Sequence, residues 1–168
     1  MSSRGFTLIE MIIILGIMAI ILTIAYPNFQ RYYINGNLRS AARGLVGDFN
    51  NQKQRAATGD AAVGGARSHR ISLDLGQNTY TLQRCTTAAS PCDGWETIQV
   101  NNLMDFGNDI VFDPGEIKTT VFDFQTRGTV TWPSSTTEEK IVLRNNRGST
   151  ATVTTNISGR TFVEFSMQ

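Results

Sequence analysis

The side chains with the widest chemistry are scarce, because the chain has only two cysteines, Cys85 and Cys92, and one histidine, His69. A structural zinc site needs about four thiolate or imidazole ligands, so these residues cannot complete one. Six residues, including Ser90-Pro91, separate the cysteines. Such a close pair in a loop predicts a disulfide, which would place this part of the chain in an oxidising compartment; two free thiols are the alternative.

Carboxylates offer a second kind of site. Four of them lie within twelve residues, and Ca²⁺ binds clustered carboxylates: Asp105, Asp109, Asp113 and Glu116. Their spacing matches no calcium loop, so a solvated loop is the favoured interpretation. His69 has no identifiable acid or nucleophile as a partner and is expected at the surface, at the start of a strand. With no nucleophile elbow among the serines, the sequence indicates no enzyme, no metal site and no cofactor.

Glu10 is the most unusual carboxylate, because it lies inside a hydrophobic run. Every residue from 11 to 22 is apolar or glycine, and the apolar character continues to Tyr26. As a helix, residues 6–26 would span about 30 Å, the thickness of a bilayer core. The run exceeds the ~7–15 apolar residues of a secretory signal peptide and ends in no small-x-small cleavage site. It also lacks the polar face of a buried core helix, so a retained single-pass membrane helix is predicted.

Charge is distributed unevenly along the chain. The formal net charge is +1, which gives no global basic field for nucleic acid. Residues 28–59 carry five Lys or Arg and one acid, a net charge of +4, whereas residues 60–168 carry nine bases and twelve acids, a net charge of −3. Only Arg4 precedes the hydrophobic run, so counting the flanking bases favours a cytoplasmic C-terminal part. The predicted disulfide favours the opposite orientation, which folded domains can reach regardless of charge.

The residues around Glu10 resemble a known processing signal. "RGFTLIE", followed by an unbroken apolar run, resembles the class III signal of type IV pilins and pseudopilins. This resemblance implies that a prepilin peptidase removes residues 1–5 by cutting after Gly5 and then methylates the new amine of Phe6. It also implies a bacterial inner-membrane precursor with a periplasmic head. The precursor would be assembled with other pilins by an inner-membrane platform.

This resemblance gives Glu10 a role in filament assembly. An acid near the end of a membrane helix costs less than the roughly 2.5–3.5 kcal/mol at its centre, so it is tolerated but not free. After cleavage, the Phe6 amine is a cation in the same low-dielectric layer. Pairing of one subunit's Glu10 with a neighbour's Phe6 amine would satisfy both charges and favour one axial register.

Beyond residues 6–27 the helix is expected to continue as an amphipathic half, residues 28–59. Pro27 removes a backbone hydrogen bond and should bend the helix, and Gly16 weakens it further upstream. The resemblance implies that the stretch from Gly16 to Pro27 partly unwinds in the filament. Apolar residues at three- and four-residue spacing are expected to face a domain core: Phe29, Tyr32, Tyr33, Leu38, Ala41, Ala42, Leu45, Val46, Phe49 and Ala56.

Residues 60–168 are predicted to form a β-rich head. The stretch 59–67 ends the helix with loop signals, and "WPSSTTEEK", residues 132–140, is expected to be an exposed loop. The predicted fold class is α+β, with a long N-terminal helix packed on an antiparallel β-sheet or β-sandwich. Short alternating segments between Gly and Asn turns predict the strands: 69–75, 79–84, 95–100, 109–112, 119–125, 129–132, 141–145, 151–155 and 160–166.

A second, looser resemblance covers the C-terminal half. "FDFQTRGTVTWP" and "KIVLRNNRGSTATVTTNISGR" resemble GspH/FimT-type minor pilins and pseudopilins, mainly through Gly128, Gly148, Gly159 and Arg160. Generic hairpin turns are the alternative explanation of these glycines.

The two resemblances imply three candidate functions. The first is a structural minor subunit of a type IV pilus, in a tip or assembly-priming complex. The second is a minor pseudopilin of a type II secretion system. The third is a DNA-binding minor pilin for natural transformation, with Arg144, Arg147 and Arg160 as phosphate contacts. The net charge of −3 on residues 60–168 argues against nucleic acid as a partner.

Overall fold

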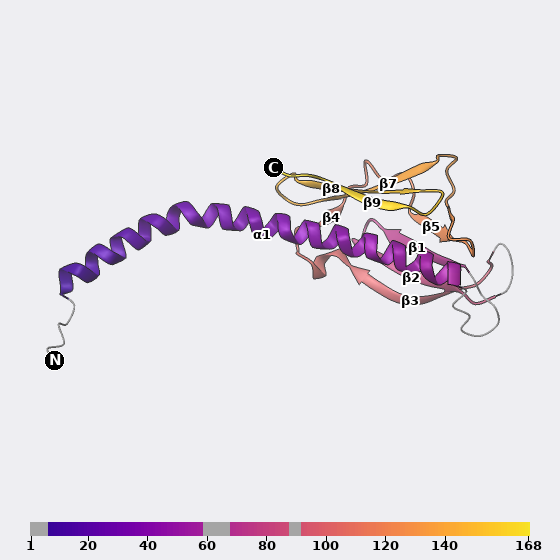
Figure 1. Ribbon diagram of the computed structural model, residues 1–168, viewed down its shortest axis with the longest axis horizontal. Coiled ribbons are helices and arrows are strands. Elements are labelled where there is room, and N and C mark those ends of the chain that lie inside the picture. Colours follow the sequence, from indigo (N-terminus) through magenta and orange to yellow (C-terminus); the bar gives the residue numbers. More distant parts are fainter. Residues whose placement is uncertain (1–6, 59–67, 88–91) are drawn as a thin grey trace. The chain divides into compact units, whose positions relative to one another are not determined.

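The computed structural model describes residues 7–58, 68–87 and 92–168. Helix α1 runs from Leu8 to Thr58 without interruption (Figure 1). The chain divides into two compact units, Met1–Ile34 and Asn35–Gln168. The first unit contains the N-terminal half of α1, and the second contains the C-terminal half of α1 together with every strand described.

The N-terminal half of α1 has an apolar surface. Its large hydrophobic side chains between Leu8 and Ile24 are 43–78% exposed. An 18-residue stretch of the helix reaches a mean hydropathy of 2.8, and none of that stretch is buried. By length and composition, α1 is therefore able to cross a membrane.

The second unit contains two antiparallel sheets. The five-stranded sheet has the order β3-β2-β1-β5-β6, and the four-stranded sheet has the order β4-β7-β8-β9. A 3₁₀ turn, Leu103–Asp105, follows β3. The strands are β1 (His69–Asp74), β2 (Thr79–Cys85), β3 (Trp95–Asn102), β4 (Val111–Phe112), β5 (Val121–Phe124), β6 (Val130–Thr131), β7 (Glu138–Arg144), β8 (Thr150–Asn156) and β9 (Thr161–Ser166). The predicted α+β fold with a helix and antiparallel sheets is confirmed.

A hydrophobic core joins the C-terminal half of α1 to both sheets. Figure 1 shows this half of the helix beside the strands. Phe49 is fully buried, and its ring meets the rings of Phe122 and Phe124 edge to face, at centroid distances of 5.1 and 5.6 Å. Such aromatic pairs add to the hydrophobic gain from burial. The other buried apolar residues of the helix are Leu38, Ala41, Ala42, Leu45 and Ala56.

The core-facing surface of α1 begins later than the sequence pattern predicts. Phe29, Tyr32 and Tyr33 are 69%, 78% and 61% exposed, and the first fully buried residue of the helix is Leu38. The prediction that these three aromatic residues face the domain core is therefore wrong. Three- and four-residue spacing identifies a face of a helix, but it does not show where along the helix that face gains a partner.

The prediction that His69 lies at the surface is also wrong. His69 begins a strand as predicted, but it is only 1% exposed. The reason is that β1 lies inside the five-stranded sheet, where His69 is aligned with Arg84 on one side and Phe124 on the other. A strand with partners on both sides and a helix over one face leaves little surface for its inward-pointing residues.

The stretch 132–140 is only partly the exposed loop that was predicted. Residues 138–140 belong to β7, and Glu139 is 3% exposed. Burial raises the pKa of the Glu139 carboxyl, but hydroxyl donors from Ser134, Thr136 and Thr119, together with the charge of Lys118, outweigh burial and hold this pKa below its usual range. Hydrogen bonds from these hydroxyls explain why a charged residue is tolerated inside the head.

Two of the glycines in the C-terminal half bring the two sheets together. Gly128 and Gly159 occupy turns with φ of 74° and 71°. A Cβ added to Gly159 would collide with the carbonyl oxygen of Gly128 and approach the Lys53 side chain to 2.9 Å. Lys53 Nζ also donates a hydrogen bond to the Ser158 carbonyl, at 3.1 Å. The two turns and α1 therefore meet at one point, where only glycine provides both the positive φ and the space.

Candidate assembly site

The candidate assembly site lies at the start of α1. The predicted cleavage and methylation residues, Gly5 and Phe6, lie outside the described residues. Glu10 lies in the first turn of the helix. The backbone N–H and the hydroxyl of Thr7 both donate to Glu10 Oε2 at 2.8 Å, and the Glu10 N–H donates back to Thr7 Oγ1 at 3.3 Å.

Thr7 and Glu10 form a capping box. A threonine before the first helical residue and a glutamate three positions later satisfy N–H groups that would otherwise lack partners at the helix start. The positive end of the helix dipole also favours a carboxylate there. Thr7 was not predicted as a site residue, although the T-x-x-E pattern is a sequence signal for a capping box.

The cap also positions the acid for another partner. Both bonds from Thr7 reach Oε2, so within the described part of the chain Oε1 faces no donor. Glu10 is exposed on the helix surface. A carboxylate fixed in orientation with one oxygen accessible is suited to pairing with an external cation.

The proposed unwinding segment is helical in this structure. α1 continues through Gly16 and Pro27. A Cβ on Gly16 would meet no atom within 4 Å, so packing does not require a glycine there. The partial unwinding of this stretch in a filament stays a prediction.

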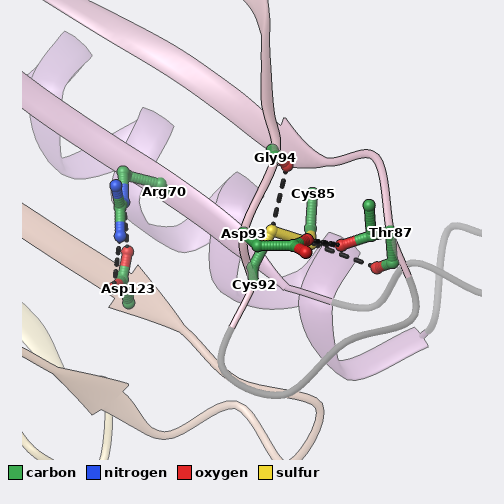
Figure 2. The surroundings of a disulfide bond; sticks show 7 residues. All are labelled: Arg70, Cys85, Thr87, Cys92, Asp93, Gly94 and Asp123. Carbon is green, nitrogen blue, oxygen red and sulfur yellow. Dashed lines mark hydrogen bonds and ion pairs between the residues drawn. A yellow bond between two sulfur atoms is a disulfide. The ribbon is translucent and has the colours of Figure 1, made fainter.

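The predicted disulfide between Cys85 and Cys92 is confirmed (Figure 2). Their Cα atoms are 6.0 Å apart, and Cys85 is the last residue of β2. A backbone hydrogen bond from Thr86 to Gly94, 2.9 Å long, closes the same connection just before β3. In the chain-entropy description a loop this short contributes roughly 2–3 kcal/mol. The disulfide therefore fastens β3, an edge strand, to its neighbour.

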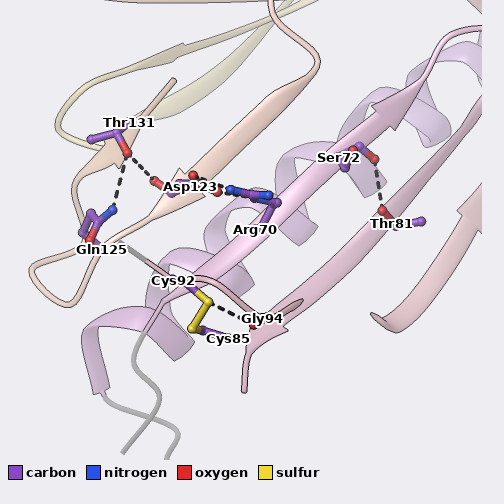
Figure 3. Close-up of polar contacts among 9 residues, drawn as sticks. All are labelled: Arg70, Ser72, Thr81, Cys85, Cys92, Gly94, Asp123, Gln125 and Thr131. Carbon is purple, nitrogen blue, oxygen red and sulfur yellow. Dashed lines mark hydrogen bonds and ion pairs between the residues drawn. A yellow bond between two sulfur atoms is a disulfide. The ribbon is translucent and has the colours of Figure 1, made fainter. Parts of the chain in front are cut away.

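Side-chain contacts of Arg70 also connect strands of the five-stranded sheet. Its guanidinium binds Asp123 through two nearly parallel bonds, Nε–Oδ1 at 2.5 Å and Nη2–Oδ2 at 2.8 Å (Figure 3). The guanidinium carbon also lies 3.9 Å from the ring centre of Trp95. Arg70 thus joins β5, β1 and β3, a cation–π and ion-pair arrangement that strand patterns alone did not reveal.

The three arginines considered for DNA contact do not come together. Arg144 ends β7 and lies 3.5 Å from the Asp113 carboxylate, and Arg147 lies in the following turn. Arg160 lies in the turn at the opposite end of β8, which at about 3.3 Å per residue separates it from the other two by about 20 Å. Arg144 and Arg147 therefore lie near one end of β8 and Arg160 near the other, and the charge of Arg144 is paired with Asp113.

The carboxylates of residues 105–116 do not assemble into a metal site. Asp113 accepts a hydrogen bond from Gly115 N–H at 3.2 Å in addition to its ion pair with Arg144. Within residues 7–58, 68–87 and 92–168, no three His, Cys, Asp or Glu side chains are grouped so that they could hold a metal ion. The stretch is only partly the solvated loop that was expected, because it contains β4 and the core residues Ile110 and Phe112.

A polar contact inside the head connects α1 to the five-stranded sheet. Tyr80 donates its hydroxyl to Asp48 Oδ2 at 2.6 Å, and Asn101 Nδ2 donates to the same oxygen at 2.9 Å. Burial and the neighbouring Asp48 carboxylate raise the pKa of Tyr80 well above its usual range. The Asp48 carboxylate of the helix therefore connects α1 to β2 and β3.

Replacing Tyr80 by phenylalanine is expected to lower the free energy of unfolding by about 1–2 kcal/mol near pH 7, because Asp48 loses a donor in a low-dielectric position. The folded-state pKa of Tyr80 lies above its unfolded value of about 10, so its contribution is complete below about pH 10 and is lost at higher pH. The variant should lack that alkaline decline. Urea titrations near pH 7 and pH 10.5, on the fragment from Asn28 onward, measure both effects; an equal decline in both proteins would contradict the assignment.

Comparisons with known proteins agree with these features. Residues 1–26 match the family described as the prokaryotic N-terminal methylation motif. The fold is similar to that of the minor pseudopilin EpsH from the type 2 secretion system of Vibrio cholerae, with a TM-score of 0.55 and 14% sequence identity over 77% of this chain and 97% of that chain. No curated protein sequence matches this chain. The family match thus covers the start of α1, and the similarity to EpsH is one of fold.

Proposed function

We propose that this chain, type IV pilin-like in its N-terminal methylation motif and in its fold, is a structural minor subunit of a type IV pilus. It acts in a tip or assembly-priming complex. The observation that carries the proposal is the methylation motif at the start of α1. There, Thr7 orients Glu10 at the N-terminal end of an exposed apolar helix surface. Pilin-like proteins assemble with other pilins in a filament, and these features suit that assembly.

The apolar surface supplies the driving force for incorporation. Side chains that are 43–78% exposed in the isolated chain need either a lipid or a protein environment. In the precursor the bilayer covers them, with the disulfide-containing head in the periplasm. In the filament, helices of neighbouring subunits take the place of lipid, and the machinery need only exchange one apolar environment for another.

The charges at the start of α1 select the axial position that the helix takes in the filament. Prepilin peptidase cuts between Gly5 and Phe6 and methylates the Phe6 amine. This leaves a cation within a few residues of Glu10. Unpaired, the cation and the carboxylate are costly in an apolar layer, whereas pairing between neighbouring subunits removes the cost for both. Only an axial position that brings them together is favoured.

A minor pseudopilin of a type II secretion system is the second candidate, because the fold is similar to that of EpsH. Both candidates use the same anchor, cap and head. They can be separated by recovery of the epitope-tagged chain in filament fractions from two strains, one lacking the pilus assembly platform and the other lacking the secretion platform. The type IV pilus assignment predicts loss in the first strain only, and loss in the second strain alone would replace it with the pseudopilin assignment.

Replacing Gly5 by valine is expected to leave the leader uncut and Phe6 unmethylated, because a side chain at the residue before the scissile bond obstructs the peptidase. Mass spectrometry of the N-terminal peptide measures both outcomes. Gly16→Ala is the matched control, since it changes a glycine in the same segment with no atom nearby, and it should be cut and methylated as in the wild type. Normal processing of the Gly5 variant would contradict the assigned cleavage site.

A further inference from the structure

Four aromatic residues near the end of the apolar half of α1 are largely exposed. Tyr26, Phe29, Tyr32 and Tyr33 are 64%, 69%, 78% and 61% exposed. All four belong to the first compact unit. Such a concentration of exposed aromatic rings within eight residues is unusual for a surface in water and indicates an amphipathic environment.

We propose that these four residues, together with Arg31, form an interfacial belt that binds the phospholipid headgroup layer where α1 leaves the bilayer. The proposal rests on the proposed function only for the direction of insertion, which places this layer on the periplasmic side. Tyrosine rings favour such interfaces because each has an apolar body and a polar hydroxyl.

Axial spacing along the helix places the belt at the right depth. If residues 6–26 cross the core of about 30 Å, then at 1.5 Å per residue Phe29 lies about 4–5 Å and Tyr33 about 10 Å beyond it. The headgroup layer is about 5–7 Å thick on each side. In a helix the Cα–Cβ bonds tilt toward the N-terminus, so the rings of Tyr32 and Tyr33 extend back toward that layer.

The polar groups of the segment match the chemistry of the same layer. Arg31 is exposed and has no ion-pair partner within the described ranges. Its apolar stem can follow the helix while the guanidinium binds lipid phosphate. Gln30 Nε2 donates to the Tyr26 hydroxyl at 3.1 Å, so the first ring of the belt already has its polar end satisfied beside the apolar run.

The bilayer is an environment that fits the segment. Within the second compact unit, Leu38 is the first residue of α1 to be fully buried. The belt is also continuous with the stretch of mean hydropathy 2.8 that is able to cross a membrane. Its function would be to fix the depth of α1 in the precursor, before any contact with other subunits.

The test uses the full-length chain in vesicles of phosphatidylethanolamine and phosphatidylglycerol, about three to one. A fluorophore on Asn28→Cys reports depth through quenching by spin-labelled lipids, with the native disulfide left oxidised. Headgroup-labelled and shallow acyl-labelled lipids should quench it at least about twofold more than deep-labelled lipid. The same label on Ile14→Cys is the control and should show the reverse order.

Two sets of substitutions then identify the belt. Changing the four aromatic residues to serine should reduce shallow quenching at position 28 about twofold or more and increase quenching by an aqueous quencher. Changing the three tyrosines to leucine keeps an apolar surface without hydroxyls and should move the label deeper. Replacing phosphatidylglycerol by phosphatidylcholine should weaken shallow quenching in the wild type but not in Arg31→Gln, because one arginine changes affinity for an anionic surface about fivefold.

An unchanged depth profile in both substitution sets would overturn the proposal. So would an unchanged profile combined with a loss of the serine variant from filaments, which would assign the aromatic residues to contacts between subunits. A wild-type chain with the expected depth profile that never enters filaments would contradict the proposed function and leave the belt intact. The two proposals can therefore fail separately.

Discussion

Replacing Glu10 by alanine is expected to leave the chain in the membrane and to reduce its recovery in sheared filaments at least tenfold. The variant loses the capping box and, under the proposed function, would also leave the Phe6 amine of a neighbouring subunit without its partner. Leaving one member of a buried ion pair without the other costs about 3–5 kcal/mol, which exceeds the 1.4 kcal/mol needed for a tenfold change. Membrane fractionation and immunoblotting of sheared filaments measure the two outcomes.

Thr7→Val distinguishes loss of the helix cap from loss of the Glu10 charge. It removes the hydroxyl of the cap, worth about 1 kcal/mol, but keeps the carboxylate and its charge. Recovery of this variant should fall no more than about fivefold. If Glu10→Ala is recovered at the wild-type level, or if both variants are equally defective, the carboxylate has no separate role in assembly.

Replacing Phe49 by alanine is expected to destabilise the head by about 3–5 kcal/mol, because it opens a cavity at the centre of the core. Phe49 is fully buried against Phe122 and Phe124, so the helix and the five-stranded sheet would both lose contacts. A domain of this size has only about 5–15 kcal/mol of stability, so much of the head population would unfold on mild heating.

The matched control for this core variant is Asn50→Ala, which changes the next residue of the same helix on its exposed side. It should alter stability by no more than about 0.5 kcal/mol. Urea denaturation of the fragment beginning at Asn28 compares both variants with the wild type. A loss below about 1.5 kcal/mol for Phe49→Ala would mean that the helix contributes less to the core than its burial indicates.

The strands were predictable because alternation of apolar and polar residues reflects burial of one face. Ile71 and Leu82, for example, are buried and directly opposite each other on neighbouring strands. The exceptions depend on three-dimensional context. His69 is buried because strands flank it on both sides, and Glu139 is buried because loop hydroxyls reach back to it. Neither contact is visible in a local pattern.

Of the candidate assembly site, Glu10 was singled out from the sequence, but the geometry around it was not. Glu10 stands out because an acid in an apolar run is costly. Thr7 stands out only as the first residue of a T-x-x-E pattern, and the hydrogen bonds show that it orients the acid. The end of the core-facing surface could not be predicted either, because Phe29 and Phe49 are both aromatic residues on one amphipathic pattern with very different exposure.

The position of Phe49 in the chain has a consequence for the order of folding. Its partner Phe122 follows 73 residues later, so the apolar face of the helix is made long before the strand that covers it. Closure of that long loop is slow compared with local contacts. Cys85 and Cys92 are only seven residues apart and can pair while the core is still open. The crosslink can therefore form before the helix is covered, and until β5 is in place the apolar face around Phe49 is open to chaperones and proteases.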